Sequence, residues 1–146
     1  MPSSYVRVAI HFVWATWDRE NTILPDWEES LYAFIAGKCK EIDCELYAVN
    51  GTTNHVHVFL RLTANLSIAD VAKLLKGSSS FFINTTFAPI RRFQWQGSYG
   101  AFAVDRENVD QVRTYILNQK QHHSDNTAIP EYEQSHAEVT LGKSLG

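Results

Sequence analysis

Hydrophobic and polar positions change their spacing several times along the chain, and each change marks a predicted element. Residues 5–16 (YVRVAIHFVWAT) are rich in β-branched and aromatic side chains, which is typical of a central β-strand. After Pro25 the apolar positions recur near helical spacing, and Glu28 and Glu29 suit the first turn of a helix. The chain is therefore expected to begin with a strand and a helix.

A β-hairpin is predicted next. Residues 44–50 and 54–62 both have the composition of strands, and residues 51–53 between them predict a tight turn. The side chain of Ser67 suits the cap of a second helix, whose apolar positions run from Ile68 to about Lys76. The hairpin and this helix continue the alternation of sheet and helix.

The last part of the pattern predicts a loop over residues 89–97, a strand over residues 98–104, and a helix capped by Asp105 that runs to roughly His122. The order β-α-β-β-α-β predicts an α+β fold with a ferredoxin-like, split βαβ antiparallel sheet. The additional C-terminal helix carries Tyr115. It is expected either to cover the free face of the sheet or to reach across to a partner.

Length and charge refine this picture. The 146 residues fit one domain, which we assign to residues 1–123, and residues 124–146 are interpreted as an acidic, poorly structured tail because they show no periodicity. The whole chain has a net charge of −3, and the tail accounts for all of it with four carboxylates and one lysine. A neutral domain can still present a local basic face to a nucleic acid.

Cysteine content and hydropathy exclude other classes. No apolar run approaches the roughly 18 residues that a membrane span needs, and the N-terminus shows no basic segment followed by an apolar one. A cytoplasmic protein without a membrane partner is expected. Cys39 and Cys44 form neither a CxxC motif nor part of a Cys/His cluster, so they are interpreted as buried thiols.

Two imidazoles share one face of the third predicted strand. In the stretch NHVHVFL, His55 and His57 lie two positions apart, and side chains alternate across a strand, so both project from the face opposite Val56. Two adjacent imidazoles can share a cation. The alternative is a pair of histidines on a solvated face of the sheet.

Tyr115 and Gln119 lie four positions apart in the last predicted helix, which places them on one helical face. A glutamine offers a carbonyl oxygen to a metal, and a tyrosine offers a phenol as a nucleophile. A phenol with a pKa near 10 needs a metal or a base beside it to react at neutral pH. The alternative is a core tyrosine and a solvated glutamine.

In combination, these segments resemble the single-tyrosine HUH transposases of the smallest bacterial insertion sequences, where U is a hydrophobic residue. The resemblance covers roughly Tyr5 to His123, and its strength comes from the order and spacing of its parts. The parts are IHFVWAT, NGTTNHVHVFL, KLLKGSSSFFIN, FQWQGSYGAFAV and YILNQKQHH.

The resemblance implies a metal-dependent enzyme. His55, His57 and Gln119 would bind Mg²⁺ or Mn²⁺, although ligand chemistry alone would favour zinc at a site with two histidines. Tyr115 would attack a phosphate of single-stranded DNA with hairpin ends, leaving a 5′-phosphotyrosine and a free 3′-hydroxyl. The family also implies a homodimer, in which the tyrosine helix of one subunit can complete the site of the other, and no small-molecule substrate.

Basic and aromatic residues provide candidates for DNA contacts. We assign phosphate and stacking contacts to Lys73, Lys76, Arg91, Arg92 and Trp95. A solvated helix face and a loop packed by its aromatic side chains explain the same residues equally well.

Two further residues are interpreted as neighbours of the site. Asn54 stands where relatives often have aspartate, so it can accept a hydrogen bond behind the metal but brings no charge. His122 lies two helical turns after Tyr115 and is a candidate proton carrier or phosphate contact, with a solvated helix end as the alternative.

Other functions fit parts of the sequence. A catalytically quiet, domesticated relative would bind DNA hairpins with the same residues. The stretch GSYGAFAV loosely echoes the aromatic strand of RNA-recognition modules, but it falls on the fourth predicted strand and not on the third. A structural metal site is disfavoured because three ligands leave an open position.

Overall fold

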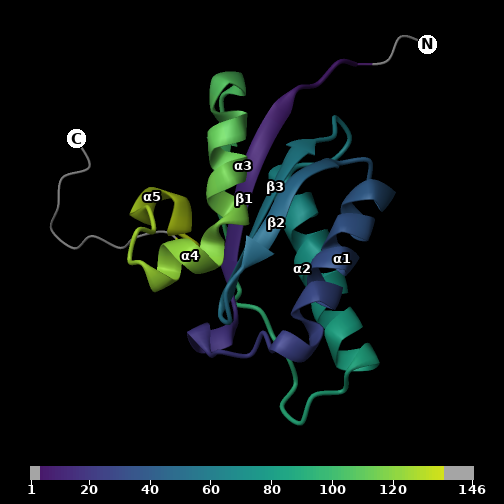
Figure 1. The fold of residues 1–146 in the computed structure, drawn as a ribbon. Coiled ribbons are helices and arrows are strands. Elements are labelled where there is room, and N and C mark those ends of the chain that lie inside the picture. The colour runs from purple at the N-terminus through teal and green to yellow at the C-terminus, as the bar shows by residue number, and fades with distance from the viewer. Residues whose placement is uncertain (1–3, 137–146) are drawn as a thin grey trace, which may run out of the picture.

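A four-stranded antiparallel sheet forms the centre of the structure, a computed structural model that describes residues 4–136 (Figure 1). Its strands are β1 (Val8–Ala15), β2 (Glu45–Gly51), β3 (His55–Leu62) and β4 (Gly100–Val104), and their order in the sheet is β2-β3-β1-β4. Each neighbouring pair is antiparallel. The predicted α+β fold with a ferredoxin-like, split βαβ sheet is confirmed.

Helices lie on both sides of this sheet (Figure 1). The long helices α1 (Pro25–Glu41) and α2 (Ile68–Thr86) cover one face. The shorter helices α3 (Val109–Leu117), α4 (Gln119–Ser124) and α5 (Pro130–Glu133) lie on the other side. Two short 3₁₀ turns, Trp17–Arg19 and Arg106–Asn108, join the elements. Within residues 4–136 no helix is long and apolar enough to cross a membrane.

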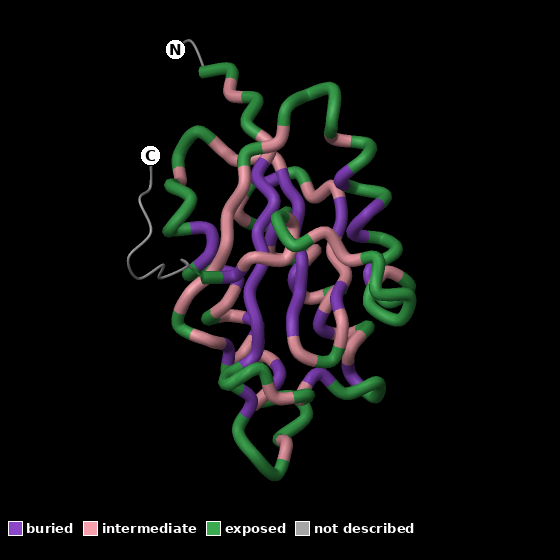
Figure 2. Tube along the Cα trace, turned by 90° about the vertical axis from the view of Figure 1, so that its left-hand side faces the viewer, coloured by how far each residue is buried: buried purple, intermediate pink, exposed green. Residues whose placement is uncertain are grey.

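The strand period of two separates two hydrophobic cores. On β1, Ile10, Phe12 and Trp14 pack with α1 and α2, and the alternate residues of β3 from Val56 to Leu60 do the same. Phe59 points to the opposite face and packs with α3. Because both faces are covered, the central strands are buried along most of their length (Figure 2).

Helix α2 is longer than the sequence pattern predicted, since it ends at Thr86 and not near Lys76. The hydroxyl groups of the serines that follow Gly77 form hydrogen bonds with carbonyl oxygens of the same helix. The hydroxyl of Ser78 donates to the carbonyl oxygen of Leu74 at 2.6 Å, and that of Ser80 donates to the carbonyl oxygen of Gly77 at 3.1 Å. Polar residues that often end a helix therefore continue this one.

The predicted third helix is divided into two. Asp105 precedes a 3₁₀ turn and makes no capping hydrogen bond among the described residues. The helical conformation is interrupted at Asn118, which separates α3 from α4. Asn50 stabilises the end of α3 because its side-chain amide donates to the carbonyl oxygens of Ile116 and Leu117, both at 3.1 Å. Tyr115 thus belongs to α3, whereas Gln119 begins α4.

Replacing Gly51 by alanine is expected to destabilise the hairpin. A Cβ at Gly51 would lie 2.2 Å from the carbonyl oxygen of His55, so the backbone has to shift, which typically costs about 1–3 kcal/mol. At the exposed position Gly37 in α1, a Cβ meets no described atom within 4 Å, so Gly37→Ala should stabilise by up to about 1 kcal/mol. Urea unfolding of both variants checks this; equal effects would contradict it.

Candidate active site

The two histidines of β3 lie on the face of the sheet that α3 and α4 cover. The alternation of side chains along β3 puts His55 and His57 on the same face as Phe59, as predicted from the sequence. Both are buried, with 4% and 0% of their surface exposed, and their ring centroids are 5.1 Å apart. The two histidines therefore do not lie on a solvated face of the sheet, which was the alternative interpretation of the sequence.

Hydrogen bonds at Nδ1 orient both imidazoles. Nδ1 of His55 lies 2.8 Å from Oδ1 of Asn54, which can only accept, so we assign the proton of His55 to Nδ1. Thr52 Oγ1 lies 2.9 Å from the same Nδ1. Nδ1 of His57 lies 2.8 Å from Nε2 of the buried His11. With Nδ1 held in this way, Nε2 of each ring points into the site.

The break between α3 and α4 brings Tyr115 and Gln119 of the same chain to these rings. Oε1 of Gln119 lies 3.1 Å from Nε2 of His55, and Gln119 is fully buried. The Gln119 amide donates to Glu133 Oε2 at 3.1 Å, which fixes its oxygen toward the histidine. The hydroxyl of Tyr115 also donates to Glu133 Oε2. The arrangement unites the predicted nucleophile and the three predicted ligands.

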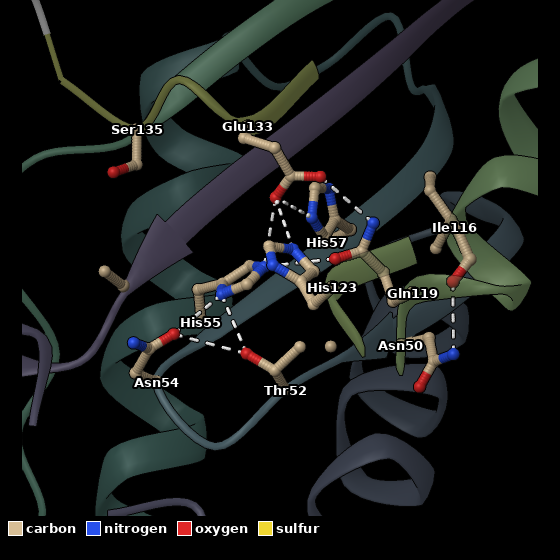
Figure 3. Close-up of polar contacts among 12 residues, drawn as sticks. Asn50, Thr52, Asn54, His55, His57, Ile116, Gln119, His123, Glu133 and Ser135 are labelled. Carbon is tan, nitrogen blue, oxygen red and sulfur yellow. Dashed lines mark hydrogen bonds and ion pairs between the residues drawn. The ribbon is translucent and has the colours of Figure 1, made fainter. Parts of the chain in front are cut away.

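Glu133, on α5, is the site residue that the sequence analysis missed. Its Oε1 lies 3.1, 3.0 and 3.2 Å from Nε2 of His55, His57 and His123 (Figure 3). Pro130 at the first turn of α5 is a helix-start signal within the segment interpreted as a tail, but it does not reveal which carboxylate faces the histidines. One ligand atom each from His55, His57 and Glu133 lies within 4.8 Å of the others, so this group could hold a metal ion.

The environment shifts the pKa values of these groups. Burial, followed by the hydrogen bond to Glu133, raises the pKa of Tyr115 to about 12, so the phenol stays protonated at neutral pH. Burial lowers the pKa of His57 and keeps its imidazole neutral, which is the form that binds metals. Burial opposes the charged form of Glu133, but hydrogen bonds from His55 and His57 hold its pKa well below the usual range.

His122 and His123 lie at the edge of the site. The ring of His122 stacks on Tyr115, with centroids 4.4 Å apart and planes 24° apart, and its Nδ1 lies 2.9 Å from Thr127 Oγ1. His123 is near His55, with centroids 4.8 Å apart. Both histidines of α4 therefore contact the residues of the site.

The predicted DNA-binding lysines lie on α2. Lys73 is exposed, and Lys76 donates from Nζ to the carbonyl oxygen of Ser98 at 3.2 Å. With Tyr99 and neighbouring small residues, the two lysines line a hollow of about 300 Å³. The structure thus places both lysines beside one recess.

The remaining predicted DNA contacts belong to the loop after α2. Arg91 and Arg92 are exposed, and Arg91 forms an ion pair with Glu20 at 3.2 Å. Trp95 is only 6% exposed, packs in the core below α2, and donates to Ser79 Oγ at 2.9 Å. Its ring is therefore engaged in packing and does not offer a face to solvent.

This fold and this site define a class of protein. An antiparallel split βαβ sheet with two histidines on a central strand and a tyrosine on the helix after the sheet is the arrangement of the single-tyrosine transposases, the class that the sequence resembles. The chain belongs to the family described as "Transposase IS200 like", which it matches over residues 4–119.

Individual relatives agree with the family. The ISDra2 transposase TnpA of Deinococcus radiodurans is 23% identical over 118 residues, covering 77% of this chain and 84% of the relative. The solved structure of a putative transposase from Deinococcus radiodurans R1 has a TM-score of 0.65 at 26% identity, covering 82% of this chain and 96% of that chain. The chain is therefore an enzyme of DNA transposition, as the resemblance implied.

A second solved structure shows the same fold at low identity. It is the REP-associated tyrosine transposase bound to a REP hairpin, with a TM-score of 0.62 and 14% identity, and it covers 84% of this chain and 73% of that chain. Its similarity therefore concerns the arrangement of the sheet and helices.

Stability is expected to fall in mild acid because His11 stays neutral in the fold. Burial, and then the charge of His57, lower the pKa of His11 from 6.5 to about 3. Below pH 6.5, His11 becomes protonated in the unfolded chain but stays neutral in the folded protein. The free energy of unfolding should therefore fall below pH 6.5 by up to about 1.4 kcal/mol per pH unit. Urea unfolding between pH 7.5 and 5 measures this slope.

The matched variant His11→Gln keeps a side chain that can hydrogen-bond to His57 but cannot titrate. Its free energy of unfolding should depend less steeply on pH between 6.5 and 5. The same slope in both proteins would show that His11 is not the group responsible.

Proposed function

We propose that this transposase cuts and rejoins single-stranded DNA with hairpin ends through a 5′-phosphotyrosine at Tyr115, with Mg²⁺ or Mn²⁺ held by His55, His57 and Gln119. One observation carries the proposal. Within a single chain, Gln119 Oε1 lies 3.1 Å from His55 Nε2. Tyr115 and His57 both form hydrogen bonds with the carboxylate of Glu133. The nucleophile and the candidate ligands therefore share one buried site.

The donor set fits a divalent cation. Two imidazoles present their Nε2 atoms, and the Gln119 amide presents an oxygen, with each group held by a second hydrogen bond. Mixed nitrogen and oxygen ligands with open positions suit Mn²⁺, and Mg²⁺ binds similar sites through additional waters. When bound, the cation would polarise the scissile phosphate and offset the charge that develops on it.

The chemistry of Tyr115 follows from its position. Its phenol oxygen would attack the phosphorus, so that the Oη–P bond forms, the P–O3′ bond breaks, and the leaving oxygen takes up a proton to become a 3′-hydroxyl. The phenol proton passes to water. Attack by another 3′-hydroxyl reverses these bond changes and joins new ends without ATP. Because its pKa is raised to about 12, the phenol is protonated at neutral pH and has to lose this proton during the attack.

Four cations of α2 and the following loop, three exposed and Lys76 half-buried, are proposed to bind the DNA backbone. Lys73, Lys76, Arg91 and Arg92 offer four cationic side chains along this part of the chain, and Lys73 and Lys76 border the same hollow. The hairpin bound by the REP-associated transposase supports a hairpin as the ligand. We assign to Trp95 the role of anchoring this loop from the core.

A homodimer remains part of the proposal because the family resemblance implies it. The site does not require a second chain to bring its residues together, since Tyr115 and His57 of one chain are packed with ring centroids 6.3 Å apart. A dimer would then serve to hold two DNA ends near each other. We therefore propose that the sites are completed within each subunit.

Tyr115→Phe should abolish covalent attachment to DNA. With labelled single-stranded DNA that carries hairpin ends and Mn²⁺, the wild-type protein is expected to give a labelled band that migrates with the protein on a denaturing gel. The variant lacks the attacking oxygen and should give no band, while hairpin affinity stays within about twofold. Tyr47→Phe, a half-buried tyrosine on β2, is the matched control and should keep the band.

Two other results are informative. Hairpin binding by the wild-type protein without any covalent band would favour the catalytically quiet relative. Loss of both binding and attachment in Tyr115→Phe would mean that the tyrosine is needed for folding.

His57→Ala and Gln119→Ala should each weaken Mn²⁺ binding at least tenfold, because each removes a proposed ligand. Calorimetric titration of the DNA-free protein measures this directly. His136→Ala, at an exposed histidine, should bind Mn²⁺ like the wild type. Unchanged affinity in both site variants would rule out the proposed metal site.

A further inference from the structure

The segment that follows α4, residues 125–136, returns across the site and is called here the return segment. At one end the backbone N–H of Ile129 donates to the hydroxyl of Tyr115 at 2.9 Å. At the other end Ser135 is buried, and its carbonyl oxygen accepts from Ser98 Oγ at 3.2 Å. Glu133 lies between these two anchors. The family match ends at residue 119, so the return segment lies outside the matched region.

Gly100 shows how closely the return segment packs against the sheet. A Cβ at this first residue of β4 would lie only 1.9 Å from the carbonyl oxygen of Gln134. The backbone of the return segment therefore rests directly on β4, next to Glu133. Its position is set by backbone contact as well as by the polar groups of the site.

The candidate ligand atoms are spaced like neighbouring ligands of one ion. Glu133 Oε1 lies 3.1 Å from His55 Nε2 and 3.0 Å from His57 Nε2, and Gln119 Oε1 lies 3.1 Å from His55 Nε2. Adjacent ligands of an octahedral ion with bonds of about 2.1 Å are about 3.0 Å apart. All three separations match the edges of an octahedron.

The polarity of these atoms also calls for a cation. Nε2 of His55 faces two oxygens, Glu133 Oε1 and Gln119 Oε1, and each lies 3.1 Å from it (Figure 3). A proton on Nε2 can point to only one of these two oxygens, whereas a cation between the three atoms would contact all of them. A divalent cation would satisfy all of them together.

We propose that Glu133 is a fourth protein ligand of the cation and that the return segment is part of the metal site. This inference rests on the proposed function, because it concerns the same cation. A carboxylate adds a negative charge and a hard oxygen to a ligand set that is otherwise neutral, which favours Mg²⁺ and Mn²⁺. Four protein ligands leave two positions of an octahedron for oxygens of water or substrate.

The test is Mn²⁺ binding to the full-length protein without DNA, measured by calorimetry and by the electron paramagnetic resonance signal of free Mn²⁺. Glu133→Gln keeps the size of the side chain but removes its charge, and we expect its affinity to fall at least tenfold. Glu131→Gln, at an exposed carboxylate of the same short helix, is the matched control and should bind like the wild type. Thermal unfolding without metal verifies that each variant is folded.

A second variant displaces the return segment without touching a ligand. Gly100→Ala should push the backbone at Gln134 away and weaken Mn²⁺ binding in the same direction as Glu133→Gln. Gly97→Ala is its control, because a Cβ there meets no described atom within 4 Å.

Wild-type affinity in both Glu133→Gln and Gly100→Ala, with binding still lost in His57→Ala, would overturn the role of Glu133 and leave the proposed function standing. If these two variants also cleaved DNA faster than the wild type, Glu133 would be a group that blocks the site and not a metal ligand. Unchanged binding in His57→Ala as well would overturn the metal site itself.

Discussion

The structure depends on the burial of two imidazoles in the middle of a sheet. A buried polar group without a hydrogen-bond partner is costly, and His55 and His57 together present four ring nitrogens. Asn54 and His11 satisfy the two Nδ1 atoms, so only the Nε2 atoms remain. Their partners come from the far end of the chain, which explains why a segment so distant in sequence packs against β3.

The break at Asn118 gives the site its shape. A continuous helix would carry Tyr115 and Gln119 on one face at a fixed offset, whereas the break lets α4 change direction after the tyrosine. Polar contacts hold the new direction: Asn50 binds the last carbonyls of α3, and Lys120 pairs with Glu28 at 3.0 Å. The same contacts attach α4 to β2 and α1, so the position of Gln119 is tied to the main core.

Sequence patterns predicted the features that depend on local geometry. The alternation of β3 placed His55 and His57 on one face, and the order of elements predicted the topology of the sheet, which the structure confirms. The position of Glu133 could not be predicted, because its contact with His57 joins residues 76 positions apart and belongs to a four-residue helix without periodicity. The burial of Trp95 could not be predicted either, because it depends on packing against core residues distant in sequence, such as Trp14, and on Ser79 of α2, which accepts the hydrogen bond of its indole.

The charges of the site link DNA binding to cation binding. Glu133 is ionised and accepts the hydrogen bond of Tyr115, so a phosphate that approaches the nucleophile meets a carboxylate of the same sign. Two such charges about 4 Å apart repel by about 4 kcal/mol at the effective dielectric constant near a protein surface. A divalent cation held by His55, His57 and Gln119 would attract both the carboxylate of Glu133 and the phosphate, and so offset this repulsion. By linkage, the cation and the DNA phosphate would then each strengthen the binding of the other.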